Sequence, residues 1–187
     1  MEYRILGKTG LKISRMGFGG IPIQKIDAAG TKVLMQKLMD AGVNYIDTAR
    51  GYTVSEEYLG YALEGIRDKF VIATKSMART KGSMEKDIEI SLKNLRTDYV
   101  DLMIVHWPDP LVPYEETFGA LNRLKEEGMI RHIGVSNFNL EQLQHALQVA
   151  DVEALQLQFS MVDLENTEIL KWAHEHDLGV MTYGSLG

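Results

Sequence analysis

The sequence predicts an α/β protein of the (β/α)8 TIM-barrel type that is incomplete, with seven strands, six helices and an N-terminal β-hairpin. Short apolar runs alternate with helical patterns at a spacing of roughly 25 to 30 residues, which is the repeat of a barrel of about 250 residues. Three successive runs also end in, or lead directly into, an ionisable residue, at Asp47, Lys75 and His106. Catalytic groups of barrel proteins lie at such strand ends.

The N-terminal segment predicts a β-hairpin followed by the first barrel strand. Apolar and polar residues alternate on both sides of a turn at 7–10, which is typical of two short paired strands. The apolar residues of this pattern are Tyr3, Ile5, Leu11 and Ile13. The first barrel strand is expected at 15–20, where Gly19 and Gly20 permit close approach of the backbone to a ligand.

Each of the first six strands is expected to be followed by a helix. The later strands are predicted at 45–47, 70–75, 100–106, 130–135, 154–158 and 179–183. The helices are predicted at 27–42, 55–63, 83–95, 113–128, 139–147 and 167–176. Asp27 and Ser83 are the expected N-caps of two of them, and Asn139 with Gln142 has capping-box spacing. The apolar face of the first helix is expected to hold Val33, Leu34, Leu38 and Ala41.

Composition restricts the class of protein. With 187 residues, 45% of them hydrophobic and 25% charged, the chain is expected to form a single partial TIM-barrel domain over 1–187. A net charge of −6 argues against binding to a nucleic-acid backbone. The absence of cysteine excludes disulfides, thiolate metal sites and a cysteine nucleophile. Without a signal-peptide pattern or a membrane-length apolar run, we expect a cytoplasmic protein with no membrane contact.

The sheet is expected to stay open, because no eighth strand follows the seventh. An open sheet leaves its first and last strands with unpaired edges. Such an edge could pair with a second copy of the chain, and the oligomeric state stays open at this point. A doubly wound open sheet would also explain the alternation, but no Gly-x-Gly-x-x-Gly sequence enters the first helix.

Short motifs occur in a fixed order along nearly the whole chain. They are Asp47-Thr-Ala with Tyr52 five residues after the aspartate, Ala73-Thr-Lys75, Val105-His106, Gly134-Val-Ser-Asn-Phe138 and Gln156-Leu-Gln-Phe-Ser160. Each motif alone occurs by chance in many chains, whereas their ordered combination is specific. In this combination the chain resembles the aldo-keto reductase family. The resemblance implies an NADP-dependent oxidoreductase that reduces aldehydes or ketones, with a small-molecule carbonyl compound as its substrate.

The resemblance implies a catalytic group of four residues. Tyr52 corresponds to the general acid, Lys75 to its cationic neighbour and Asp47 to the carboxylate partner of the lysine. His106 corresponds to the histidine beside the substrate carbonyl. Since the pKa of tyrosine is about 10, a nearby ammonium is expected to lower it and make Tyr52 a better acid. Tyr52 and a neutral His106 would stabilise the negative charge that grows on the carbonyl oxygen as hydride arrives from the cofactor.

A second group of residues is implied to bind the cofactor, expected to be NADP as NADPH, with NAD as the alternative. Ser136, Asn137 and Gln156 would bind the nicotinamide carboxamide, and Tyr183 would stack on the ring. The other expected contacts are Gly19, Gly20, Asp47, Gly184, Ser185 and Leu186. The last three of these match the start of the family's pyrophosphate loop. The family's basic residues for the 2′-phosphate belong to a region beyond this sequence, so cofactor preference is left open.

Apolar residues near the predicted strand ends suggest a substrate pocket. They are Trp107, which begins a proline-rich loop, and Ile21, Pro22 and Ile23. They do not identify a substrate. No metal site is expected, because His174 and His176 lie two residues apart and face different directions on a helix.

Two functional hypotheses follow. The first is a carbonyl-reducing enzyme. The second is a non-catalytic barrel, or barrel fragment, that keeps the nicotinamide-facing residues and acts as a redox-sensing or structural partner. Taken singly, Asp47, Lys75 and His106 also have structural interpretations as a turn residue, a rim lysine and a histidine beneath a loop. Turnover, rather than cofactor binding, distinguishes the two hypotheses.

Overall fold

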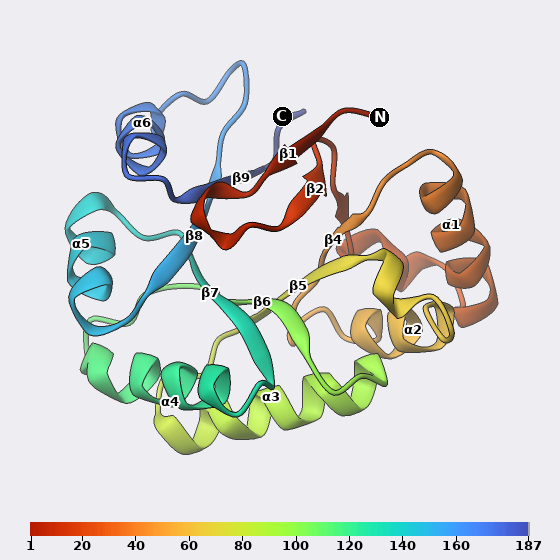
Figure 1. Ribbon diagram of the computed structural model, residues 1–187, viewed down its shortest axis with the longest axis horizontal. Helices are drawn as coiled ribbons and strands as arrows, with labels where there is room; N and C mark the ends of the chain where they lie inside the picture. Colours follow the sequence, from red (N-terminus) through yellow and green to blue (C-terminus); the bar gives the residue numbers. More distant parts are fainter. Residues whose placement is uncertain (187) are drawn as a thin grey trace.

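The computed structural model describes residues 1–186, and its central feature is a curved sheet of parallel strands (Figure 1). The strands are β3 (Phe18–Gly19), β4 (Tyr45–Asp47), β5 (Val71–Ser76), β6 (Val100–Val105), β7 (Ile130–Ser136), β8 (Val152–Gln158) and β9 (Gly179–Tyr183). They are hydrogen-bonded in sequence order, and each neighbouring pair is parallel. The predicted seven-stranded, incomplete barrel is confirmed, with β3 and β9 at the two edges.

Helices cover the outer face of this sheet, each following one of the strands β3 to β8 (Figure 1). They are α1 (Ala28–Asp40), α2 (Ser55–Ala62), α3 (Lys81–Leu95), α4 (Tyr114–Glu126), α5 (Leu140–Val149) and α6 (Thr167–Glu175). Short 3-10 turns occur at η1 (Gly7–Thr9), η2 (Ile21–Lys25) and η3 (Arg67–Lys69). Apolar helix residues such as Leu59, Ile88 and Phe118 pack on the strands in the main core. This burial is what makes crossover helices and a parallel sheet stable together.

Side-chain caps account for where three helices begin. The side chain of Asp27 accepts a hydrogen bond from the backbone three residues later at 2.7 Å, so this predicted cap is confirmed. Asn139 and Gln142 form the predicted reciprocal box, with both bonds at 2.9 Å. The prediction of Ser83 as the cap of α3 is wrong, because Thr80 is the cap and Ser83 is its partner one turn later.

The buried side of α1 also differs from the prediction. Val33 and Ala41 are exposed, whereas Thr31 and Met35 are fully buried. Thr31 and Met35 are four residues apart and therefore lie on one face of the helix, which leaves Val33 on another.

The N-terminal hairpin, β1 (Tyr3–Ile5) with β2 (Lys12–Ser14), is confirmed and closes one end of the barrel. The backbone N–H of Lys8 donates to the carbonyl of Asp177 at 2.8 Å, just before β9 begins. The backbone N–H of Ser14 donates to the Asn44 side chain at 2.6 Å, just before β4 begins. Inside the barrel the hairpin contributes to a second apolar cluster of Leu6, Ile13, Tyr45, Ala73, Leu102, Ile104, Ala154 and Met181. The carboxyl ends of the strands lie at the opposite end.

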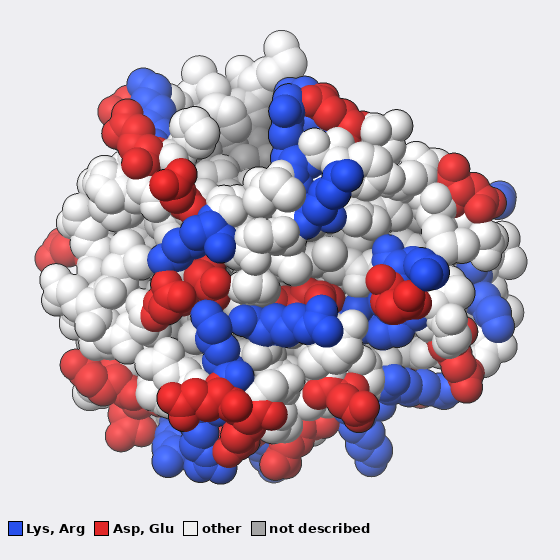
Figure 2. Space-filling view, viewed as in Figure 1, with Lys and Arg blue, Asp and Glu red and all other residues white. Residues whose placement is uncertain are grey.

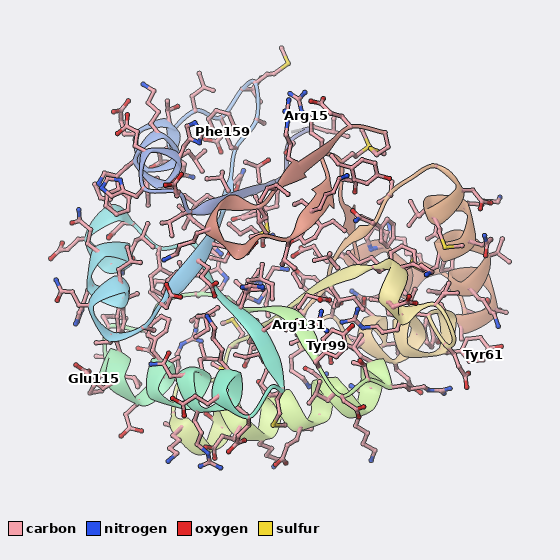
Figure 3. All side chains as sticks on the ribbon, in the orientation of Figure 1. Arg15, Tyr61, Tyr99, Glu115, Arg131 and Phe159 are labelled. Carbon is pink, nitrogen blue, oxygen red and sulfur yellow. The ribbon has the colours of Figure 1, made fainter. Side chains whose placement is uncertain are left out.

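Charged side chains of both signs are interleaved over the face seen in Figure 2. Near the starts of the strands, buried Asp101 accepts hydrogen bonds from Arg67 at 2.8 Å and from Arg131 at 3.1 Å. Arg131 also lies over the ring of Tyr99, 3.6 Å from its centroid (Figure 3). Asp101 thus offsets part of the positive charge of the two arginines. No helix within residues 1–186 has both the length and the apolar character needed to cross a membrane.

Candidate active site

The strand ends and their loops bring the residues of the predicted site, except Ile23, to one cavity of about 1220 Å³. Asp47 ends β4, Lys75 lies in β5, His106 follows β6, Ser136 ends β7, Gln156 lies in β8 and Tyr183 ends β9. Tyr52 reaches the cavity from the loop between β4 and α2. Because the strands are parallel and adjacent, residues far apart in sequence line the same space. The cavity also reaches Glu2, Ile13 and Ser14 of the N-terminal hairpin, and its volume therefore exceeds the roughly 300 to 1,000 Å³ typical of small-molecule sites.

A buried ion pair lies at the centre of the site. The Nζ atom of Lys75 donates to Oδ2 of Asp47 at 2.7 Å and to the carbonyl oxygen of Thr48 at 2.9 Å. The side chain of Lys75 is only 2% exposed, and that of Asp47 is 17% exposed. Burial lowers the pKa of Lys75, while the charge of Asp47 and its hydrogen bond oppose that effect. The carboxylate therefore stabilises an ammonium that water hardly reaches.

Tyr52 lies above this ion pair. The Nζ atom of Lys75 is 5.1 Å from the centroid of the Tyr52 ring. Burial, followed by the charges of Asp47 and Tyr183, raises the pKa of Tyr52 to about 12. The expected net lowering of this pKa is wrong, because burial of the phenol and the negative charge of Asp47 dominate. Tyr52 therefore carries its proton throughout the neutral pH range.

His106 is the second polar group beside Tyr52. The two rings are arranged edge to face, with their centroids 6.0 Å apart. Burial and the charge of Lys75 lower the pKa of His106 to about 4, with a smaller opposing effect of Asp47. His106 is therefore uncharged at neutral pH, as expected from the sequence.

Four amide and hydroxyl side chains form the neighbouring wall. Gln156 donates from Nε2 to Oδ1 of Asp47 at 3.1 Å. Asn137 donates to the backbone carbonyl of His106 at 2.9 Å and to the hydroxyl of Ser136 at 3.0 Å. The hydroxyl of Tyr183 donates to Oδ1 of Asn137 at 2.7 Å. The amide of Asn137 is thus already engaged by protein groups, whereas no partner within residues 1–186 is found for Oε1 of Gln156.

Backbone and apolar groups complete the rim. The N–H of Gly20 donates to the carbonyl of Asp47 at 2.7 Å, and a Cβ atom there would lie 2.6 Å from Oγ of Ser55. The predicted residues that also line the cavity are Gly19, Ile21, Pro22, Trp107, Gly184, Ser185 and Leu186. The indole of Trp107 is 47% exposed and available to a ligand. The expectation for Ile23 is wrong, because it is fully buried in the main core beneath η2.

Several residues that the sequence did not point to also belong to the site, among them Thr48, Tyr45 and Met181. The carbonyl of Thr48 accepts a hydrogen bond from Lys75. The position of Thr48 directly after Asp47 in the sequence could have suggested this contact. Tyr45 and Met181 also line the cavity, where the Tyr45 hydroxyl donates to the sulfur of Met181 at 2.7 Å. Nothing in the sequence distinguishes Met181 from other apolar strand residues.

Known proteins are similar to this chain in sequence and in fold. The family model described as Aldo/keto reductase family matches residues 15–187. Aldo-keto reductase YhdN of Bacillus subtilis (strain 168) is 37% identical, over 100% of this chain and 62% of that protein. The NADH-specific methylglyoxal reductase of Escherichia coli (strain K12) is 31% identical, over 97% of this chain and 66% of that protein.

A solved structure of an aldo/keto reductase is also similar to this chain. An aldo/keto reductase from Klebsiella pneumoniae, in complex with NADP and acetate, superposes with a TM-score of 0.89 at 28% identity. The match covers 98% of this chain and 68% of that chain. The present chain thus spans about two thirds of the length of these proteins. From the matched family model and the level of identity, the chain belongs to the aldo/keto reductase family.

Proposed function

We propose that this chain reduces aldehydes or ketones to alcohols with a nicotinamide cofactor, and that Tyr52 is the proton donor. The observation that carries the proposal is the buried Lys75–Asp47 ion pair beneath a protonated Tyr52 and a neutral His106. The stability of the fold does not require these four groups to lie together. Family membership gives independent support to the reaction class.

The proposed chemistry assigns one task to each side chain. The reduced cofactor, when bound, supplies hydride to the carbonyl carbon. Tyr52 donates a hydrogen bond to the carbonyl oxygen and transfers its proton as negative charge develops there. The neutral imidazole of His106 donates a second hydrogen bond to the same oxygen. Lys75 stabilises the phenolate of Tyr52 that proton transfer leaves behind, and Asp47 holds Lys75 in place.

The polar wall of the cavity fits a nicotinamide carboxamide. Because Nε2 of Gln156 is directed to Asp47, its Oε1 atom is left to accept a hydrogen bond from the carboxamide NH2. Ser136 is paired with Gln156 across β7 and β8, and its hydroxyl can donate to the carboxamide oxygen. Tyr183 borders the same space and offers a ring face for stacking. We propose NADP as the cofactor, as in the Klebsiella complex, with NAD as the alternative raised by the NADH-specific relative.

Substitution of the proposed proton donor tests this function. We expect Tyr52→Phe to reduce kcat for aldehyde reduction by at least about 100-fold, because it removes the proton donor and leaves the cavity shape intact. The dissociation constant of NADPH, measured by nicotinamide fluorescence, should change little. The assay is steady-state oxidation of NADPH and, separately, of NADH with small aliphatic and aromatic aldehydes.

Tyr61→Phe is the matched control, since Tyr61 is partly exposed on α2 and lies outside the cavity lining. Its kcat should equal that of the wild type. Equal turnover by wild type and Tyr52→Phe would contradict the proposed role of Tyr52. Saturable cofactor binding without any turnover in the wild type would favour the non-catalytic alternative.

A further inference from the structure

Glu56 is a buried carboxylate close to the site that the proposed chemistry does not use. It lies in the first turn of α2, four residues after Tyr52, and is 1% exposed. It is not among the residues that line the cavity. A carboxylate so far removed from water requires compensating partners, and it is retained only where those partners are held in place.

Three segments of the chain meet at this carboxylate. Oε1 accepts a hydrogen bond from the hydroxyl of Thr74 at 2.7 Å, and Thr74 lies in β5. Oε2 accepts from Nη1 of Arg50 at 3.0 Å, and Arg50 lies in the loop that carries Tyr52. Oε2 also accepts from the side-chain amide of Asn94 in α3 at 3.3 Å. Glu56 therefore connects this loop, the strand of Lys75 and a neighbouring helix.

Arg50 is fixed to the strand of Lys75 a second time. Its backbone N–H donates to the carbonyl oxygen of Lys75 at 2.8 Å. Two residues later, the N–H of Tyr52 donates to the carbonyl of Ala49 at 3.0 Å, and the carbonyl of Tyr52 accepts from Ser55 at 2.8 Å. The short loop is thus anchored on both sides of Tyr52, by Arg50 before it and by the start of α2 after it.

Thr74 and Lys75 face opposite sides of the sheet, because neighbouring strand residues alternate in direction. Thr74 binds Glu56 on the outer side, while Lys75 binds Asp47 toward the cavity. The carboxylates of Glu56 and Asp47 therefore hold adjacent residues of β5 from opposite faces. Movement of Glu56 would shift the loop of Tyr52 relative to Lys75.

We propose that Glu56 is a positioning residue for carbonyl reduction, which holds the Tyr52 loop in register with Lys75 through its ion pair with Arg50. The catalytic part of this proposal rests on the proposed function, whereas the anchoring of the loop does not.

Glu56→Gln tests the proposal because it keeps the shape of the side chain and loses the charge that binds Arg50. We expect the amide hydrogens of Arg50 and Tyr52 to exchange with solvent at least about tenfold faster, as the loop opens more often. We expect kcat to fall by about 10- to 100-fold with little change in the KM of the cofactor, because Tyr52 is displaced from the reacting oxygen. Arg50→Met removes the same ion pair by changing its more exposed member, Arg50. This variant should reproduce both effects.

Glu153→Gln is the matched control. Glu153 is 6% exposed and accepts hydrogen bonds from Lys125 at 2.7 Å and from His132 at 2.8 Å, near the start of β8 at the opposite end of the barrel. Glu153→Gln should lower the free energy of unfolding about as much as Glu56→Gln does. It should leave kcat and the hydrogen exchange of the Tyr52 loop unchanged.

The outcomes separate the two proposals. The positioning role would be overturned if Glu56→Gln and Arg50→Met showed the same loop exchange and the same kcat as Glu153→Gln. Faster loop exchange together with unaltered kcat would also overturn it and leave Glu56 with a structural role. If the wild type shows no turnover, the proposed function fails. In that case the anchoring of the loop is still tested, because unchanged loop exchange in both variants would refute it.

Discussion

At the scale of single residues, the centre of the site is a charge pair that is costly to bury. Removing an ammonium and a carboxylate from water costs several kcal/mol per ion, and their attraction offsets this only in good geometry. Lys75 meets that condition with two short hydrogen bonds, and Asp47 with one from Lys75 and one from Gln156. Replacing a buried ion pair with apolar residues of similar volume is often neutral or stabilising, so stability alone does not account for this pair. The proposed reaction gives it a role.

His106 makes the stability of the fold depend on pH. Its pKa is about 4 in the folded protein, below the ordinary 6.5 expected when unfolded. Between these values the unfolded chain binds more protons than the folded chain, so the free energy of unfolding decreases as pH falls from 6.5 to 4. Urea unfolding measured across this range should show a weaker decrease for His106→Gln than for the wild type.

His174→Gln provides the comparison, because His174 is exposed on α6 and away from Lys75. Its pH dependence should follow that of the wild type. An identical decrease in the wild type and in His106→Gln would show that burial of the imidazole has no effect on its titration.

At the scale of elements, short sequence signals decide where helices begin. The reciprocal box of Asn139 and Gln142 satisfies two backbone N–H groups at the start of α5. Asn139→Ala should lower the free energy of unfolding by about 1 kcal/mol, measured by urea denaturation. Gln144→Ala, on the exposed face of the same helix, should change it by less than about 0.5 kcal/mol. A loss in Asn139→Ala no larger than in Gln144→Ala would mean that the cap contributes nothing.

The errors in predicting elements have physical causes. Thr80 and Ser83 both have capping side chains, and only the observed backbone conformation decides which of them precedes the first turn. Val33 is apolar yet exposed, because the direction of the buried face of α1 is set by its contacts with neighbouring elements rather than by its own sequence. Hydrophobic periodicity therefore predicts that a helix exists more reliably than which residues it buries.

At the scale of the whole molecule, strand order and the location of the site were predictable. Parallel strands separated by helices place their carboxyl ends together, so Asp47, Lys75 and His106 had to meet once the barrel was recognised. The pKa of Tyr52 was not predictable in this way. It depends on burial and on the nearby charges of Asp47 and Tyr183, which are properties of the assembled cavity. The engagement of Asn137 by Tyr183 likewise exists only once β7 and β9 lie in one sheet.

The central claim is that this chain transfers hydride from a nicotinamide cofactor to a carbonyl carbon. The most direct measurement is to incubate the chain with an aromatic aldehyde and with NADPH or NADH carrying deuterium at the transferred position, and to analyse the alcohol by mass spectrometry. We predict an alcohol that contains one deuterium with the wild type, and none above background with Tyr52→Phe. Folded wild-type chain that binds cofactor and yields no deuterated alcohol would contradict the claim.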